Sequence, residues 1–252
     1  EYYSFNEKIK INFSKLSSFF KYFYSSAIVL GSFPGKKIMK GISNSKRLNI
    51  FFNLSVKKDS RILDVGCGDG MKFLYPLKEI GFKNVLGCDP FLSDSKMYKN
   101  GLKIVNDSIF EVNGQWDLIT FHHSFEHLSN PLEYLIKVED SLANTGVCVI
   151  RIPTTSSYAW DHYNTDWVQL DAPRHFFLHS RKSIEILASK AKLELFEVIY
   201  DSGHAQFTGS EKYLNNIPLR QKQKKYLINK IKHIVQKRIY MSRAKKLNRE
   251  NR

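Results

Sequence analysis

The sequence predicts an α/β fold with a doubly wound, mostly parallel sheet. Short hydrophobic runs alternate with helical segments along most of the chain, as they do in βαβ proteins. The first run, residues 62–65, contains Asp64 near its end and enters a glycine-rich loop, and the second, residues 85–90, contains the acid Asp89 near its end. Open α/β sheets bind ligands at the carboxyl ends of their strands, so both acids are expected at the ligand-binding edge.

The glycine loop is the strongest single signal. Asp64 opens the segment Asp-Val-Gly-Cys-Gly-Asp-Gly, whose glycines alternate with other residues: Gly66, Gly68 and Gly70. Glycine is needed where the backbone turns through left-handed conformations or lies against a ligand. A dinucleotide-binding loop would carry a glycine at Met71, and a phosphate-binding loop would carry Ser or Thr after Lys72, so the segment fits neither pattern.

The segments after the loop continue the alternation. A helix is expected from Leu74 to Ile80, and Gly81 ends it before the second strand. A further helix is expected to begin at Ser180. The remaining expected elements are strands at 103–105, 116–121, 147–153 and 195–200, and a helix at 131–142.

Asp-x-Gly-x-Gly-x-Gly after a first strand resembles the first motif of the class I S-adenosylmethionine-dependent methyltransferases, whose fold is Rossmann-like. The resemblance covers roughly residues 45–215 and implies S-adenosylmethionine as the cofactor. It implies that Asp64 and Gly66 hold the methionine moiety and that Asp89 binds the ribose hydroxyls, a task that suits two carboxylate oxygens. The cofactor-binding residues that it implies are Asp64, Gly66, Cys67, Gly68, Gly70, Asp89, Pro90, Asp107, Ser108 and His122.

Two later segments carry a narrower resemblance. Ser124 to Leu128 resembles a branch that includes ubiquinone-biosynthesis O-methyltransferases and sugar methyltransferases, and residues 171–175 are similar to a subset often found in bacterial surface-polysaccharide gene sets. The resemblance implies methylation of a hydroxyl on a small polar acceptor, such as a sugar or a nucleotide-linked precursor. Methylation of a small amine, and a non-catalytic scaffold that binds the cofactor, remain alternatives.

Histidine is the side chain best suited to take a proton from a hydroxyl acceptor near neutral pH. The candidates are His123, His127 and His175. His175 lies in an aromatic insertion, residues 154–179, which we expect to form a lid over the strand ends; its aromatic side chains either contact the acceptor or form a small core of their own. Arg174 could bind a phosphate group of the acceptor.

No metal site is predicted from the residues alone. The segment His123-Ser-Phe-Glu126-His127 matches a zinc-peptidase pattern, but that pattern requires a helical site and a third ligand. The ubiquinone O-methyltransferases have Glu in place of His123 and are associated with a divalent cation. That resemblance leaves open a site made by His123, Glu126 and His127.

The positive charge is concentrated in the C-terminal tail. The segment from Arg220 to Arg252 contains thirteen Lys and Arg residues and a single acid, Glu250, in a chain of formal net charge +15. Apolar residues recur there at helical spacing, so residues 216–252 are expected to form a basic amphipathic helix that binds a membrane surface or a second subunit, or packs on its own domain. Motifs of base methyltransferases are missing, so a nucleic-acid substrate is not expected.

The length of 252 residues suits one principal domain, expected at residues 46–215, after an N-terminal helical extension at 1–45. Three cysteines without regular spacing give no disulfide framework, which favours a reducing cytoplasm. We find no apolar run long enough to span a bilayer and no secretion signal.

Overall fold

A computed structural model describes most of the chain from Val56 to Gln221. The predicted N-terminal extension, residues 1–45, lies outside the described residues, and so does most of the predicted tail helix. The residues described are 54, 56–200, 204–221, 238–239, 242–243 and 246. Among them, no helix is both long enough and apolar enough to cross a membrane.

The chain divides into two compact units, which are described separately below. The first unit holds the residues up to Thr120 together with Leu142–Cys148. The second holds Phe121–Ser141 and the residues from Val149 onward. Two strands of the sheet run from the first unit into the second.

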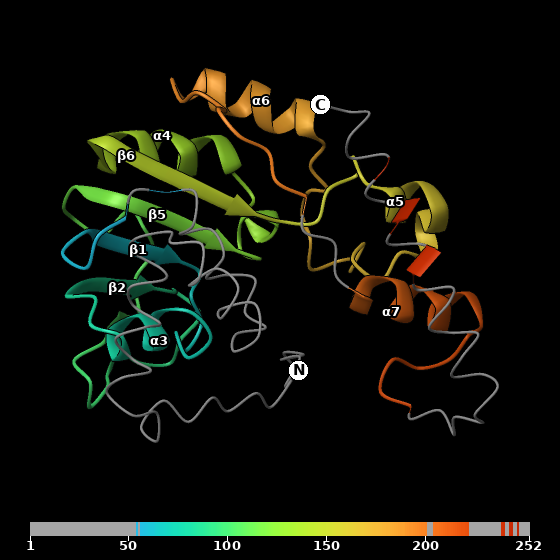
Figure 1. Ribbon diagram of the computed structural model, residues 1–252, viewed down its shortest axis with the longest axis horizontal. Helices are drawn as coiled ribbons and strands as arrows, with labels where there is room; N and C mark the ends of the chain where they lie inside the picture. Colours follow the sequence, from blue (N-terminus) through green and yellow to red (C-terminus); the bar gives the residue numbers. More distant parts are fainter. Residues whose placement is uncertain are drawn as a thin grey trace. The chain divides into compact units, whose positions relative to one another are not determined.

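One mostly parallel sheet confirms the predicted fold class. Its strands lie in the order β3-β4-β2-β1-β5-β6. β1 pairs in parallel with β2 and β5, β2 pairs in parallel with β4, and β3 is antiparallel to β4. In Figure 1 the arrows of β1, β5 and β6 point the same way. The strand bounds are β1 Arg61–Val65, β2 Asn84–Cys88, β3 Lys96–Met97, β4 Lys103–Val105, β5 Trp116–His122 and β6 Leu142–Arg151.

The core of the first unit follows from hydrophobic runs that are buried on both faces of the sheet, as parallel strands usually are. Ile62 and Leu63 of β1 and Leu118 and Ile119 of β5 have no exposed surface. Helix α3, Leu74–Glu79, adds two more fully buried side chains, Leu74 and Leu77. The loop between β1 and α3 is therefore held between two buried elements.

Helices and loops make up most of the second unit. The predicted Ser180 start of helix α6 is confirmed: the Ser180 hydroxyl accepts from the Ser183 amide at 3.1 Å, and the Ser180 amide donates to the Ser183 hydroxyl at 3.0 Å, which is a capping box. The helices are η3 Phe125–His127, α4 Pro131–Ser141, α5 Tyr158–Tyr163, η4 Asn164–Asp166, α6 Arg181–Lys190 and α7 His204–Leu214.

The aromatic insertion builds a small core with α7. Tyr163 and Trp167 are buried against Phe207 of α7. The Trp167 indole N–H donates to the Gln206 side-chain oxygen at 3.2 Å, so its polar end is satisfied. Of the two roles considered for these aromatics, the small core is the one observed, although Phe176 stays largely exposed. A role as a lid stays a prediction.

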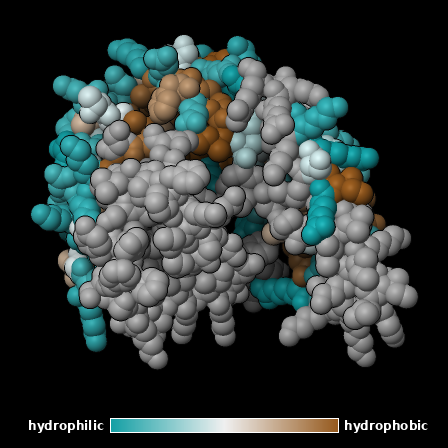
Figure 2. Space-filling model, viewed as in Figure 1, coloured by the Kyte–Doolittle hydropathy of each residue, from teal (hydrophilic) through white to brown (hydrophobic). Residues whose placement is uncertain are grey.

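The strand predicted at residues 195–200 does not form in the described structure. Phe196 and Ile199 are 65% and 57% exposed, and Figure 2 shows hydrophobic side chains at the surface among hydrophilic ones. A segment with β-prone residues becomes a strand only when a neighbour pairs with it. Residues 216–221, expected to open the tail helix, form turns and irregular structure instead.

Candidate active site

The glycine loop adopts the conformation that its alternating glycines predict. Gly66, Gly68 and Gly70 have φ angles of +69°, +57° and +67°, all in the left-handed region. The Gly66 amide donates to the Cys88 carbonyl at 2.8 Å, and the Gly70 amide donates to the Cys67 carbonyl at 3.1 Å. The loop therefore folds tightly against the end of β2.

Two of these glycines have different surroundings. A Cβ added at Gly68 would meet no atom of the described residues within 4 Å, whereas one added at Gly70 would lie 2.7 Å from the Ile104 Cδ1 atom. The backbone at Gly68 therefore borders open space into which a ligand can approach. Gly70 instead lets the loop pack on β4.

Asp89 stands at the carboxyl end of β2 and is only 9% exposed. Its Oδ2 atom accepts from the Gly68 amide at 2.8 Å, and its Oδ1 atom accepts from the Phe91 amide at 3.0 Å. Each carboxylate oxygen keeps a second lone pair, so the group can also accept hydroxyl hydrogen bonds. Asp89 braces the loop and at the same time suits a ribose diol.

Asp64, in β1, is 1% exposed. Its Oδ1 atom accepts from the Thr120 hydroxyl at 2.8 Å, across the β1–β5 pair. The carboxylate is held at a fixed place beside the glycine loop. The first unit thus brings Asp64, the glycines and Asp89 to one edge of the sheet, as predicted.

In the second unit, His123 follows β5 with a φ of +56°. Its Nε2 atom lies 2.7 Å from the Arg151 Nη1 atom. A guanidinium can only donate, so the His123 Nε2 lone pair accepts this bond and the proton of a neutral ring is on Nδ1, 3.3 Å from Glu126 Oε1. In this arrangement His123 has no lone pair to offer as a base.

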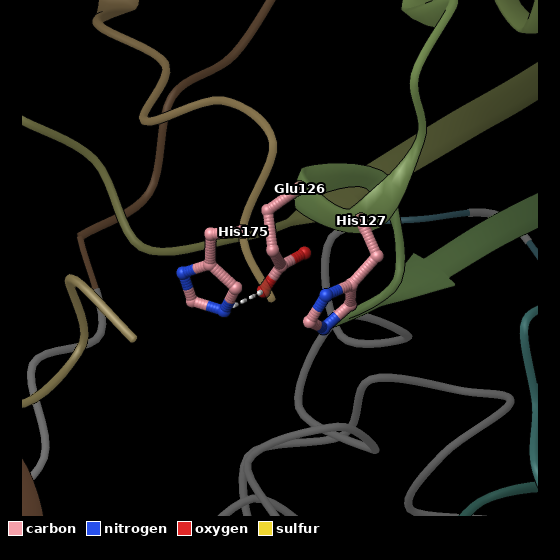
Figure 3. A group of neighbouring side chains, drawn as sticks. All are labelled: Glu126, His127 and His175. Atoms are coloured by element: carbon pink, nitrogen blue, oxygen red, sulfur yellow. Dashed lines mark ion pairs between the residues drawn. The ribbon is translucent and has the colours of Figure 1, made fainter. Parts of the chain in front are cut away.

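His127 and His175 lie beside the same carboxylate (Figure 3). The His127 Nδ1 atom lies 2.8 Å from the Arg174 carbonyl oxygen, which can only accept, so Nδ1 carries the proton and Nε2 the lone pair. The His175 Nε2 atom is 4.0 Å from Glu126 Oε1 and 3.8 Å from Asp171 Oδ2. Burial lowers the pKa of His175, and Glu126 partly opposes that shift. The geometry therefore leaves the His127 Nε2 lone pair available to accept a proton, and burial favours the neutral form of His175.

A comparison with protein families identifies the family of a chain that carries this glycine loop and these two acids. Residues 43–198 match the family described as a methyltransferase domain, which is more than half of the chain. The chain belongs to this methyltransferase family. Asp64, the glycine loop and Asp89 form a cradle that fits the S-adenosylmethionine implied by the sequence resemblance: the glycine backbone is open at Gly68, and Asp64 and Asp89 flank it.

Solved structures that are similar to this methyltransferase have low sequence identity to it. A mycolic acid cyclopropane synthase in complex with SAH is 16% identical, with a TM-score of 0.50 over 69% of this chain and 68% of its own. A cyclopropane synthase from Mycobacterium tuberculosis is 14% identical, with a TM-score of 0.49 over 92% and 87%. A magnesium protoporphyrin IX methyltransferase from Synechocystis, with bound SAH, is 13% identical, with a TM-score of 0.48 over 68% and 82%. No curated protein matches the chain.

The remaining residues expected at the methyltransferase cofactor have varied surroundings. Asp107 and Pro90 are exposed, and His122 is buried at the end of β5. Ser108 directs both its amide and its hydroxyl to the Glu111 carboxylate, which is ordinary turn chemistry. Their contacts with the cofactor stay a prediction.

The three cysteines of the methyltransferase are free thiols. Burial raises the pKa of Cys88 and of Cys148 to about 12 in each case. Burial, with Asp64 nearby, also raises the pKa of Cys67. Protonated thiols are poor nucleophiles, so Cys67 shapes the loop by its size.

Sequence reasoning missed three residues that position the site. The Thr120 hydroxyl donates to the Asp64 carboxylate, and the Arg151 guanidinium donates to His123 Nε2. Gly87 lets the loop approach β2, because a Cβ there would lie 2.5 Å from the Cys67 Sγ atom. A glycine inside a strand is a recognisable signal of close approach. The other two follow only from strand pairing and loop conformation.

Proposed function

We propose that this methyltransferase methylates a hydroxyl group of a small polar acceptor, such as a sugar or a nucleotide-linked precursor of a bacterial surface polysaccharide. The observation that carries the proposal is a polar hollow in the second unit, of about 440 Å³. It lies between the segment after β6 and the start of α6. Its lining residues are Thr155, Ser156, Asp161, Arg181, Lys182, Glu185 and Tyr200.

The chemistry of this hollow supports a polyhydroxylated acceptor. Carboxylates, hydroxyls and cations together offer both donors and acceptors to sugar hydroxyls. Arg181 is oriented by Glu185, since its Nε atom donates to Glu185 Oε1 at 2.9 Å. Its backbone amide donates to the Ser156 hydroxyl at 3.1 Å, which ties the two sides of the hollow together.

A phosphate on the acceptor also suits this place. Arg181 and Lys182 occupy the first turn of α6, where the helix dipole and the cations both favour an anion. Arg174, which the sequence suggested for this purpose, is instead paired with the Asp171 carboxylate. Arg181 and Lys182 are paired as well, both with Glu185. They line the hollow and Arg174 does not, so we assign the proposed phosphate contacts to the α6 terminus.

The histidines support transfer to oxygen. The cofactor supplies an electrophilic methyl group, while a hydroxyl acceptor must lose its proton during transfer. The Arg174 carbonyl fixes the His127 tautomer, so the His127 Nε2 lone pair is available to accept that proton. His175 is kept neutral by burial and is the second candidate, whereas His123 is engaged by Arg151.

The test is turnover of S-adenosylmethionine with a panel of acceptors: free sugars, nucleotide-linked sugars and small amines. We expect demethylated cofactor to form with a sugar or a nucleotide-linked sugar. Arg181→Ala should lower kcat/KM at least tenfold, which corresponds to about 1.4 kcal/mol. Lys190→Ala is the matched control, because Lys190 is exposed in the last turn of the same helix.

Turnover with amines alone would contradict oxygen as the acceptor atom. An equal loss in Arg181→Ala and Lys190→Ala would show that the hollow does not bind the acceptor. A normal rate with sugars in the His127→Ala variant would remove His127 from the proposed chemistry.

A further inference from the structure

Glu126, His127 and His175 form a cluster of potential metal ligands. Each offers one ligand atom, and these atoms all lie within 4.8 Å of one another. Figure 3 shows Glu126 and His127 extending from η3 and His175 from the loop that faces it. The three side chains come from segments nearly fifty positions apart in the sequence, so the fold assembles the cluster.

Hydrogen bonds to backbone carbonyl groups hold the two segments together. The Phe176 amide donates to the Glu126 carbonyl at 3.0 Å, and the His127 Nδ1–H donates to the Arg174 carbonyl at 2.8 Å. The residues on both sides of His175 are thus tied to η3. A metal-bound histidine commonly has its other nitrogen fixed by a carbonyl in this way.

The Glu126 carboxylate is the strongest indication of a cation site. Its side chain is 1% exposed; Oε1 lies 3.3 Å from the protonated His123 Nδ1, and Oε2 receives no hydrogen bond from the part of the chain that the structure describes. The nearest nitrogen atoms are His123 Nδ1 at 3.3 Å and His175 Nε2 at 4.0 Å. A buried carboxylate with an oxygen that lacks a donor is costly, and a bound cation would offset that cost.

We propose that Glu126, His127 and His175 bind a divalent transition-metal ion of the Zn²⁺ type. Two imidazoles and one carboxylate favour such an ion over Mg²⁺, which prefers oxygen ligands and water. Three protein ligands leave one position of a tetrahedral site open. The ligand set differs from the His123, Glu126 and His127 set that the sequence left open, because Arg151 occupies His123.

Binding requires a small contraction of the cluster. Ligand atoms about 2.1 Å from a tetrahedral ion lie about 3.4 Å apart, so the widest separation must close by roughly 1.4 Å. With the metal bound, an acceptor hydroxyl at the open position would be acidified by the ion, and His127 would then serve as a ligand instead of a base.

The test uses tag-free, full-length protein freed of metal with a chelator. Calorimetric titration with Zn²⁺, and the visible absorption of bound Co²⁺, should report one site. His175→Ala and Glu126→Gln should each weaken binding at least tenfold. His162→Ala is the matched control, because His162 is exposed in α5 and outside the cluster. Equal concentrations of Mg²⁺ should not compete.

Binding of S-adenosylhomocysteine by each variant shows that the protein remains folded. Zn²⁺ binding that is equal in wild type, His175→Ala and Glu126→Gln would overturn the proposal, and so would no saturable binding by the wild type. Either outcome leaves the acceptor proposal standing, since the acceptor panel tests it separately in chelator-treated protein.

Discussion

The Thr120 hydroxyl donates a 2.8 Å hydrogen bond to the Asp64 carboxylate, and both side chains are buried. The two residues are direct partners in the parallel β1–β5 pair. The sheet register therefore brings a hydroxyl donor to the acid that precedes the glycine loop. Removing a donor from a buried carboxylate costs more than the bond itself contributes, because the acceptor loses its partner without regaining water.

Replacing Thr120 tests this support. Thr120→Val keeps the side-chain shape and removes the donor, so we expect the free energy of unfolding to fall by about 1–3 kcal/mol. S-adenosylhomocysteine binding should weaken as well. Thr120→Ser, which keeps the hydroxyl, should retain most of the free energy of unfolding and most of the affinity for S-adenosylhomocysteine. Equal behaviour of the two variants in urea denaturation would argue against the hydrogen bond as the cause.

Gly87 tests the packing beneath the loop. A Cβ at Gly87 would lie 2.5 Å from Cys67 Sγ and 2.6 Å from Leu74 Cδ1. We expect Gly87→Ala to lower the free energy of unfolding by about 1–3 kcal/mol through overpacking. Adding Cys67→Ala should recover part of the loss, which a double-mutant cycle in urea would measure. Strictly additive effects would place the strain elsewhere.

The strands and the glycine loop could be predicted because their signals are local. β1 and β2 lie where the hydrophobic runs place them. The alternating glycines at 66, 68 and 70 indicate a backbone with positive φ angles, as observed. Helix α6 begins at its predicted cap, Ser180. These features depend on residues within a few positions of one another, and a single sequence contains them.

The features that escaped prediction depend on distant partners. β3 has only two residues and exists because it pairs with β4. Phe196 and Ile199 lie in a segment with the composition of a strand, but the described structure supplies no neighbour for it. The bond between Arg151 and His123 arises where the ends of β6 and β5 meet, which no local pattern reveals.

The raised pKa values of the thiols give a prediction about reactivity. Because burial raises the pKa of Cys88 and Cys148 to about 12, and that of Cys67 as well, the thiolate form is scarce at pH 8. A colourimetric thiol reagent should react slowly with the folded protein. After denaturation it should react with all three thiols without that delay. Fast reaction of a thiol in the folded protein would contradict this account.

His179 gives a prediction about pH and stability. Burial lowers its pKa, with Glu126 opposing the shift, and its ring packs against Phe125 at 5.4 Å and Phe177 at 5.6 Å between ring centroids. The unfolded chain therefore takes up a proton at higher pH than the folded one. Stability is full above the unfolded pKa of about 6.5 and falls as the pH drops toward the lower folded pKa.

Urea denaturation of wild type and His179→Gln between pH 8 and pH 5.5 measures this effect. We expect the wild type to lose more stability on acidification than the variant does. The variant should still lose some stability on acidification, though less than the wild type, because burial also lowers the pKa of His175. Parallel pH profiles for the two proteins would remove His179 as a cause.

The central claim is that the cradle of Asp64, the glycine loop and Asp89 binds S-adenosylmethionine. Calorimetric titration with S-adenosylhomocysteine, comparing wild type with Asp89→Ala, tests it most directly. We predict saturable binding by the wild type and a loss of tenfold or more in the variant, which is about 1.4 kcal/mol. No binding by the wild type, or equal affinity in the two proteins, would contradict the account.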